Sequence, residues 1–482
     1  MKKAKIKKII TVGVVLTFLG FIIAPSMSAH ITNKKPYSET SKSFIENPMK
    51  QLESDYDLLI ITPDEFSNTL QPLKKHKEKF GVKTSIVSLS YIYADIVDGH
   101  DNPEKIKLFI KKTFEESGIK YVLLVGNFRK MPIRYVYNDE PYEYFPEPYF
   151  ISELYYSDIY DENGNFSSWD SNDNGIFGEW KDDEAQDKDI DLYPDVYVGR
   201  IACRNRLEVR IMVNKIINYE TKTYGSDWFN KILAIAGDTY PPGSYDFPTP
   251  DFEGEENAKT AISYMVGFEN TTLFTSDNTL TGPADVIREI NSGYGFLFFD
   301  GHGNPMLWGT HPPNDIVNWT DGLTLIKMGY LNNKNMLPIC LVGGCHNNQF
   351  DTNIFNLIGD FYWAYATGIW TPECWGWKLT RMLRGGSIAT IGNTALGMTK
   401  EDKVSQEGAS DYLDSQLFYE YGTNGTDILG EAWGKAITNY IDKYPIDWNQ
   451  NSTSDSAIDA KTVQQWVLLG DPSLKIGGYP PQ

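Results

Sequence analysis

Between residues 57 and 125 the chain alternates short apolar runs with longer segments of helical character. The apolar runs at 57–62, 82–89 and 121–125 have the length and composition of buried strands. Helices are predicted between them, at 64–80 and 102–117, and a glycine follows each predicted helix. Strands joined through helices pair in parallel, because the connection has to cross the sheet. The alternation therefore predicts an α/β fold built on a mostly parallel sheet.

The alternation resumes after a long insertion. Residues 138–195 are rich in Tyr, Pro, Asp and Asn, and we interpret them as an ordered excursion from the sheet. Further strands are predicted beyond them, including runs at 231–236 and 296–300. We expect two packed α/β halves in a three-layer αβα arrangement, with one subdomain at 56–225 and the other at 226–482.

The first 29 residues have the pattern of an export signal. Basic residues come before an apolar stretch, Ile9–Ala24, and small residues suited to cleavage follow it. We therefore expect a signal peptide at 1–29, a linker or short pro-segment at 30–55, and a secreted or extracellular protein. The alternative is a retained signal anchor at the cell surface, the one arrangement in which we expect a membrane as partner.

Charge and cysteine content exclude two classes of protein. The net charge of −20 argues against nucleic acid as a partner, because phosphate binding needs clustered positive charge. Four cysteines in 482 residues do not make the disulfide framework that holds small secreted domains together. The hydrophobic content of 41% is instead sufficient for a large core.

Two apolar runs lead into glycines and a chemically active side chain. The run at 296–300 leads to His302, which has a glycine on either side, and the run at 337–342 leads through two glycines to Cys345. Functional groups of open α/β sheets lie just past the carboxyl ends of strands. If the two strands are neighbours, a thiol and an imidazole meet at one sheet edge, as a cysteine nucleophile and its histidine base require. A lone cysteine or histidine is otherwise more often a packing residue.

These motifs resemble those of the gingipain-type cysteine peptidases, which have a caspase-like fold. The resemblance covers roughly residues 55–475. It rests on Gly301-His302-Gly303 and on Gly344-Cys345, each after an apolar strand, with supporting marks at Asp195–Arg200, Gly385–Ala389 and Leu468–Pro472.

The resemblance implies an endopeptidase that acts through a thioester acyl-enzyme. Cys345 matches the nucleophile and His302 the general base and acid, and the carboxylate that orients the histidine falls on Asp238. The backbone N–H groups of Gly303 and Cys345 would form the oxyanion hole. The expected partner is a protein or peptide substrate, and no organic cofactor is expected.

An acidic stretch after Asp238 bears on specificity. Asp251 and Glu253 lie near the position at which arginine-specific relatives place an acidic pocket residue, although Phe252 stands at the aligned position itself. A carboxylate there would favour Lys or Arg at P1, the substrate residue before the cleaved bond. An exposed acidic loop is the alternative interpretation.

The insertion contains a candidate calcium loop. Oxygen-bearing side chains alternate along it and a glycine makes its turn, so the candidate ligands are Asp170, Asn172, Asn174, the Ile176 carbonyl and Glu179. Lys181 stands where an EF-hand has its last acidic ligand, so the loop is not an EF-hand. The alternative is a surface loop rich in Asx turns.

Two other functions compete with a secreted cysteine endopeptidase. The first is a calcium-stapled surface or adhesion protein on an inactive peptidase scaffold. The second is a metalloenzyme that uses His302, His311 and His346, although the chain lacks a ligand pair at helical spacing. His346 also lies next to Cys345, but adjacent residues of an extended segment point apart, which favours His302 as the base.

Overall fold

The structure, a computed structural model, describes residues 55–139, 147–244, 252–358, 361–399 and 408–481. The predicted signal peptide, all of the predicted linker except its last residue, and the candidate residue Asp251 lie outside these ranges. Within the described part of the chain, no helix is both long and apolar enough to cross a membrane.

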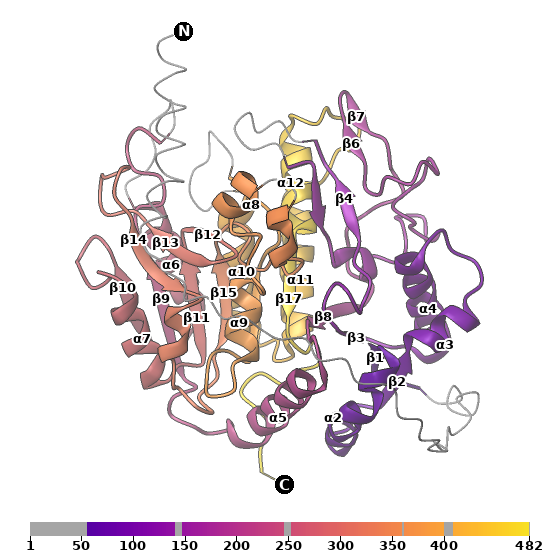
Figure 1. The fold of residues 1–482 in the computed structure, drawn as a ribbon, viewed down its shortest axis with the longest axis horizontal. Helices are drawn as coiled ribbons and strands as arrows, with labels where there is room; N and C mark the ends of the chain where they lie inside the picture. Colours follow the sequence, from indigo (N-terminus) through magenta and orange to yellow (C-terminus); the bar gives the residue numbers. More distant parts are fainter. Residues whose placement is uncertain (1–54, 140–146, 245–251, 359–360, 400–407, 482) are drawn as a thin grey trace, which may run out of the picture.

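The first sheet lies in the N-terminal half and is wholly parallel, with strand order β2-β1-β3-β8. Its strands are β1 (Leu58–Thr62), β2 (Thr84–Ser88), β3 (Tyr121–Val125) and β8 (Tyr197–Ile201). The associated helices are α2 (Ser67–Lys79), α3 (Leu89–Asp95), α4 (Asn102–Ser117) and α5 (Arg206–Lys222) (Figure 1). Local sequence sets their ends: α4 begins after Asp101, whose side chain accepts the Glu104 N–H, and ends at the left-handed Gly118.

The second sheet has the order β10-β9-β11-β15-β16-β17, and all of its pairs are parallel except β16 with β17. Its strands are β9 (Lys231–Ala236), β10 (Glu269–Phe274), β11 (Phe296–Asp300), β15 (Ile339–Gly343), β16 (Ala389–Asn393) and β17 (Trp466–Leu469). The helices of this half of the chain are α6 (Glu253–Tyr264), α7 (Pro283–Ser292), α8 (Phe361–Thr367), α9 (Trp375–Arg381), α10 (Ala409–Phe418), α11 (Leu429–Lys443) and α12 (Asp455–Gln464).

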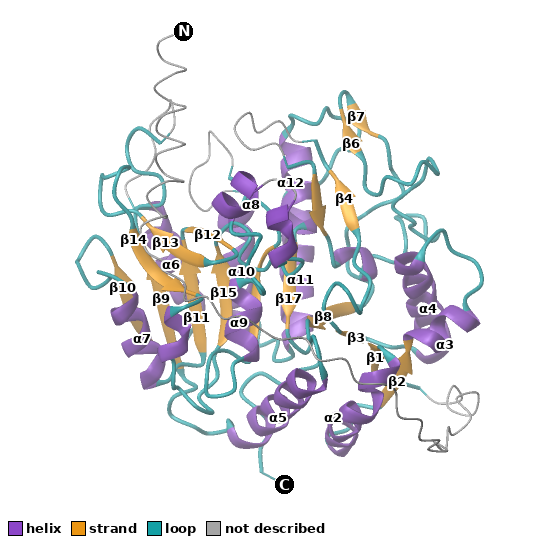
Figure 2. Cartoon of the chain, viewed as in Figure 1, coloured by secondary structure: helices purple, strands orange, loops and turns teal. Residues whose placement is uncertain are grey.

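Different helices cover the two faces of the second sheet, because successive strand residues point to opposite sides. Leu297 and Phe299 of β11 belong to a core cluster shared with α7 and α9. Phe296 and Phe298 belong to the other cluster, shared with α6 and α10. The sheet therefore lies between two helical layers, as Figure 2 shows. The predicted fold class, α/β with mostly parallel sheets, is confirmed.

The two sheets meet at β8 and β17. A Cβ at Gly199 would lie 2.7 Å from the carbonyl oxygen of Gly470, so the backbones can approach only because residue 199 has no side chain. Beside this contact the buried Lys77 Nζ pairs with Glu220 Oε1 at 2.7 Å and with Asp471 Oδ2 at 2.8 Å. The segment around Gly470 and Asp471 thus joins the C-terminal strand to helices α2 and α5 of the first half.

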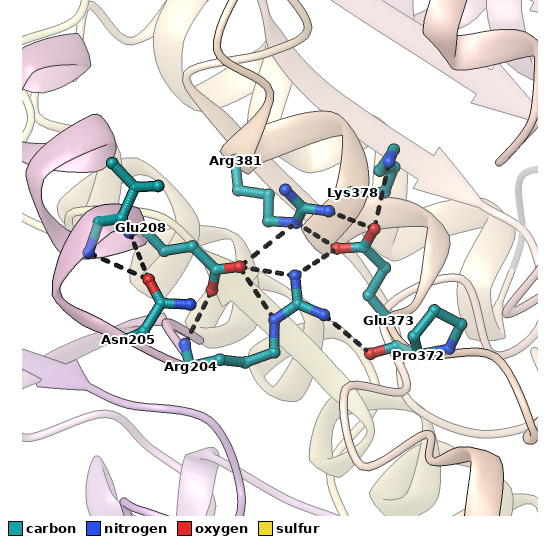
Figure 3. A network of polar contacts seen from close by, with 8 residues as sticks. Arg204, Asn205, Glu208, Pro372, Glu373, Lys378 and Arg381 are labelled. Carbon is teal, nitrogen blue, oxygen red and sulfur yellow. Dashed lines mark hydrogen bonds and ion pairs between the residues drawn. The ribbon is translucent and has the colours of Figure 1, made fainter. Parts of the chain in front are cut away.

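A second polar joint links the loop before α5 to α9 (Figure 3). Arg204 Nη2 lies 2.6 Å from Glu208 Oε1 and 3.4 Å from Glu373 Oε2. Glu373 also pairs with Arg381, and with Lys378 at 3.2 Å. Burial alone would raise the pKa of Glu373, but Arg381, Lys378 and Arg204 outweigh it and hold that pKa below its ordinary value.

We expect Glu373→Gln to lower the free energy of unfolding by about 2 kcal/mol at pH 7, because the change removes charge-assisted bonds from a buried carboxylate to three half-buried cations. A carboxyl whose folded-state pKa is depressed contributes stability above its unfolded pKa, and this contribution fades as the pH falls. In urea titrations the difference between the two proteins should therefore stay constant from pH 7 to about pH 5.5 and shrink as the pH falls below the unfolded-state pKa of about 4.5. Glu78→Gln, which removes an exposed partner of Lys74, is the control and should change little.

Small antiparallel elements lie outside the two main sheets. The insertion contributes β4 (Tyr135–Tyr137), β5 (Tyr149–Ile151), β6 (Trp180–Lys181) and β7 (Glu184–Ala185). A three-stranded sheet follows β11 directly and consists of β12 (His302–Asn304), β13 (Leu307–Thr310) and β14 (Thr320–Thr324). This last sheet carries the candidate histidine and was not predicted from the sequence.

Candidate active site

His302 and Cys345 lie at the same edge of the second sheet. β11 and β15 are parallel neighbours, and their last residues, Asp300 and Gly343, are register partners. Each candidate residue therefore follows its strand end by two positions. Both residues line one narrow cavity, together with side chains from α6 and α10.

The His302 ring is fixed by a backbone carbonyl. Its Nε2 lies 2.7 Å from the Thr239 oxygen. A carbonyl only accepts, so Nε2 carries the hydrogen and Nδ1 holds the lone pair that a general base needs. Burial, with a smaller contribution from His311, lowers the pKa of His302 to about 4. The imidazole is therefore neutral at pH 7 and able to take a proton.

Cys345 is held as a neutral thiol. Its Sγ accepts the Gly397 N–H at 3.2 Å, and burial raises the pKa of the thiol to about 11. The resting pair is thus an uncharged thiol and an uncharged imidazole, and no thiolate is preformed. Such a pair can react if the base removes the proton as sulfur attacks a carbonyl carbon.

Glycines let the two segments meet. A Cβ at Gly344 would lie 3.1 Å from the Gly303 backbone nitrogen, and a Cβ at either glycine would clash with the Asn347 amide. The fully buried Asn347 donates to the carbonyls of Asn304 at 2.8 Å and Leu307 at 3.0 Å, so it fastens the cysteine loop to the β12–β13 hairpin. This arrangement brings Gly303 beside Cys345. That the backbone N–H groups of Gly303 and Cys345 form an oxyanion hole stays a prediction.

Asp238 lies two residues beyond the end of β9 and directly before Thr239, whose carbonyl holds His302. It is buried, its Oδ2 accepts the Asn314 N–H at 2.7 Å, and it forms a β-bridge with His311. Its charge acts to raise the pKa of His311, although burial keeps that pKa below its ordinary value. The bond that fixes the His302 ring comes from Thr239, so the orienting role assigned to Asp238 stays a prediction.

The three histidines of the metalloenzyme hypothesis have separate partners. His311 Nδ1 lies 2.7 Å from the Asn318 carbonyl, and His346 Nδ1 lies 3.1 Å from Gln349 Oε1. Among the residues that the structure describes, the one group of three His, Cys, Asp or Glu side chains close enough to share a metal lies in and beside the insertion. The geometry of the described residues therefore gives no support to a metal held by His302, His311 and His346.

The cavity beside Cys345 and His302 is acidic, and we call it the acidic cavity. The carboxylates of Glu253, Asp300 and Asp411 line it, and the described residues around it include no lysine or arginine. Glu253, which was predicted from the sequence as a candidate substrate-binding residue, begins α6 and is 4% exposed. Asp300 and Asp411 were not predicted as site residues, since their positions in the sequence give no sign that β11 and α10 converge.

Among the residues that the structure describes, three buried oxygens of the acidic cavity have no hydrogen-bond partner: Thr239 Oγ1, Glu253 Oε2 and Ser410 Oγ. The other Glu253 oxygen accepts the Tyr240 N–H. Buried polar groups without partners are costly, and so many around one space indicate a place for a ligand that donates several hydrogen bonds.

The candidate calcium loop is closed by its own side chains. Asp170 accepts the backbone N–H groups of Asn174 and Gly175, each at 2.9 Å, and Asn174 Nδ2 donates to Glu179 Oε2 at 2.7 Å. Asn172 Oδ1 also accepts the Asn174 N–H, and Asn174 Oδ1 accepts that of Ile176. The three side chains close enough to share a metal are instead His100, Asp170 and Asp173. Calcium prefers six to eight oxygens, so calcium binding stays a prediction.

We expect added calcium to raise the melting temperature until it saturates, by the equivalent of about 2.7 kcal/mol at a hundred times Kd. Calorimetry of wild type and Asp170→Ala, with calcium, with magnesium and with a chelator, tests this expectation. Asp183→Ala, which removes an exposed carboxylate nearby, is the control and should keep the calcium response. An equal response of Asp170→Ala and wild type would favour the plain surface loop.

Comparisons with known proteins agree with this geometry. Residues 51–477 match the model of Peptidase family C25. Gingipain R2 of Porphyromonas gingivalis is 21% identical over 426 residues, which cover 87% of this chain and 46% of the relative. An uncharacterized protein of Archaeoglobus fulgidus is 24% identical over 368 residues, covering 71% of this chain and 76% of the relative. The chain thus spans about half the length of the curated gingipain.

Two solved structures share the fold. The complex of Porphyromonas gingivalis RgpB pro- and mature domains aligns with a TM-score of 0.60 at 18% identity and covers 87% of this chain and 79% of that one. The Arg specific cysteine proteinase gingipain R aligns with a TM-score of 0.59 at 19% identity, covering 88% and 78%. The caspase-like, gingipain-type architecture expected from the sequence is confirmed.

Proposed function

Because the chain belongs to peptidase family C25, the gingipain-type cysteine peptidases, we propose that it is a secreted endopeptidase that cleaves after a basic residue. Cys345 acts as the nucleophile and His302 as the general base and acid. The acidic cavity receives the P1 side chain. The proposal rests on buried oxygens that have no partner in the described part of the chain, in a cavity that the thiol and the imidazole also line.

The chemistry of the cavity selects its occupant. Arg and Lys are rich in donors and positively charged, so either can satisfy carboxylate and hydroxyl oxygens at once. An apolar P1 side chain would leave those oxygens desolvated and unpaired, at a cost of about 1–3 kcal/mol for each. One solved relative is described as Arg specific, which supports the same preference.

The reaction follows from the placement of the two groups. With a P1 side chain in the acidic cavity, the scissile carbonyl lies against Cys345. His302 takes the thiol proton as sulfur attacks, then gives it to the leaving amine as the acyl-enzyme forms. Water, activated by the same imidazole, releases the acid product. The N–H groups of Gly303 and Cys345 stabilise the oxyanion in both steps.

We expect Glu253→Gln to lower kcat/KM for peptides with Arg or Lys at P1 by about 30-fold, since it removes a charge-assisted bond and keeps the side-chain shape. Peptides that differ only at P1, carrying Arg, Lys, Gln or Leu, provide the measurement. Glu255→Gln is the matched control, because this buried carboxylate of the same helix bonds Ser276 instead. Wild-type enzyme that prefers Leu at P1 would contradict the proposed specificity.

A further inference from the structure

A further buried carboxylate, that of Asp414, lies next to the lining residue Asp300 of the acidic cavity. Asn257 Nδ2 donates to Asp300 Oδ2 at 2.7 Å and to Asp414 Oδ1 at 2.9 Å. The remaining oxygens of the pair converge on Gly343: a Cβ there would lie 2.9 Å from Asp414 Oδ2 and 3.7 Å from Asp300 Oδ1. The Asn257 amide thus bonds two buried carboxylates at once. Their other oxygens lie near Gly343, which is two residues before Cys345.

We propose that the acidic cavity is protonated while it is empty and releases protons when a P1 cation enters, so that substrate recognition is linked to pH. The inference rests on the proposed preference for a basic P1 residue and adds a regulation of that site. The released protons pass to the solvent, and the positive charge of the substrate takes their place.

The charges around the cavity explain why it holds protons. Glu253, Asp300 and Asp411 line the cavity, Asp414 shares the Asn257 amide with Asp300, and no cation among the described lining residues offsets their charges. Asp238 adds to the repulsion at Glu253, and His302, the titratable base facing the cavity, is neutral at pH 7. Carboxyl groups in such a setting keep a proton until an opposite charge arrives.

The direction of each pKa agrees with this arrangement. Burial raises the pKa of Glu253 to about 8 and that of Asp411 to about 7, and it raises the pKa values of Asp300 and Asp414 well above their ordinary range. Below these values the carboxyls are neutral and attract a cation weakly. A P1 cation stabilises the ionised form, so its affinity should rise with pH from 6 to 8.

The test is calorimetry of the Cys345→Ala protein, which cannot cleave its ligand, with Nα-benzoyl-arginine amide at pH 7. The titration is run in phosphate and in Tris, which differ greatly in ionisation enthalpy. We expect the observed enthalpies to differ by the heat of transferring about one proton to the buffer. Measurable binding with equal enthalpies would overturn the inference and leave the P1 preference intact. Absence of binding at every pH would overturn both.

Variants identify the source of the protons. In the Cys345→Ala background, Asp414→Asn should release fewer protons and bind the probe several-fold more tightly at pH 6, because Asp300 loses its competing neighbour. Glu255→Gln, whose carboxyl also has a raised pKa but does not line the cavity, should release as many as the parent. If Asp414→Asn does not fold, Glu253→Gln serves instead, and its release should fall. Unchanged release in the folded variant would contradict the assignment.

Discussion

A Cys345→Ala protein is expected to fold normally and to lose at least about five orders of magnitude in peptide cleavage. The change removes the sulfur that forms the acyl-enzyme, and the members of such a catalytic unit fail together. The fold should survive, because Cys345 lies in a loop beyond β15, partly exposed, and outside both core clusters. Turnover of a peptide with Arg at P1, together with thermal unfolding, measures both effects.

Cys340→Ala is the matched control for this experiment. Cys340 lies inside β15, is fully buried and packs within the core, so its loss should cost stability but not the chemistry. Turnover retained by a folded Cys345→Ala protein would contradict the assignment of the nucleophile. An inactive wild type, by contrast, would favour the adhesion protein on a peptidase scaffold.

His302→Ala is expected to lower the rate of acylation by about three orders of magnitude, because the uncharged thiol then has no group to remove its proton. The loss should be larger at pH 7 than at pH 10, where hydroxide begins to deprotonate a thiol whose pKa is about 11. Single-turnover kinetics across this pH range separate the role of the base from a loss of structure, which would not be relieved at high pH.

His346→Ala is the control for the base. His346 follows Cys345 directly, but its backbone is left-handed, with φ of 57°, and its ring bonds Gln349. Its loss should cost far less activity than that of His302. If His346→Ala proved the more damaging of the two changes, the base would be assigned to the wrong histidine.

The parallel sheets and the strand-end position of both candidate residues could be predicted because they depend on local patterns. Apolar runs such as Phe296–Asp300 and Ile339–Gly343 are buried on both faces, and the glycines after them mark the sheet edge. Since the carboxyl ends of parallel strands share one edge, the pairing of His302 with Cys345 needed only that β11 and β15 be neighbours, and they are.

The surroundings of the pair depend on contacts between distant segments, and these have no local signature. The carbonyl that holds His302 belongs to Thr239, which lies 63 residues away in the chain. Asp414 reaches Asn257 from a separation of 157 residues. A backbone carbonyl carries no sequence signal at all, and the family resemblance pointed to the neighbouring carboxylate of Asp238, whose orienting role stays a prediction.

Covalent labelling shows directly whether Cys345 attacks substrates whose P1 cation enters the acidic cavity. The wild-type protein is incubated with a peptidyl-arginine chloromethyl ketone, digested, and analysed by mass spectrometry. We expect one adduct for each chain, on the peptide that contains Cys345. It should form much faster than with the matching leucine reagent and be absent from His302→Ala on the same time scale. An adduct on Cys203, Cys340 or Cys374, or equal rates for the two reagents, would contradict the proposal.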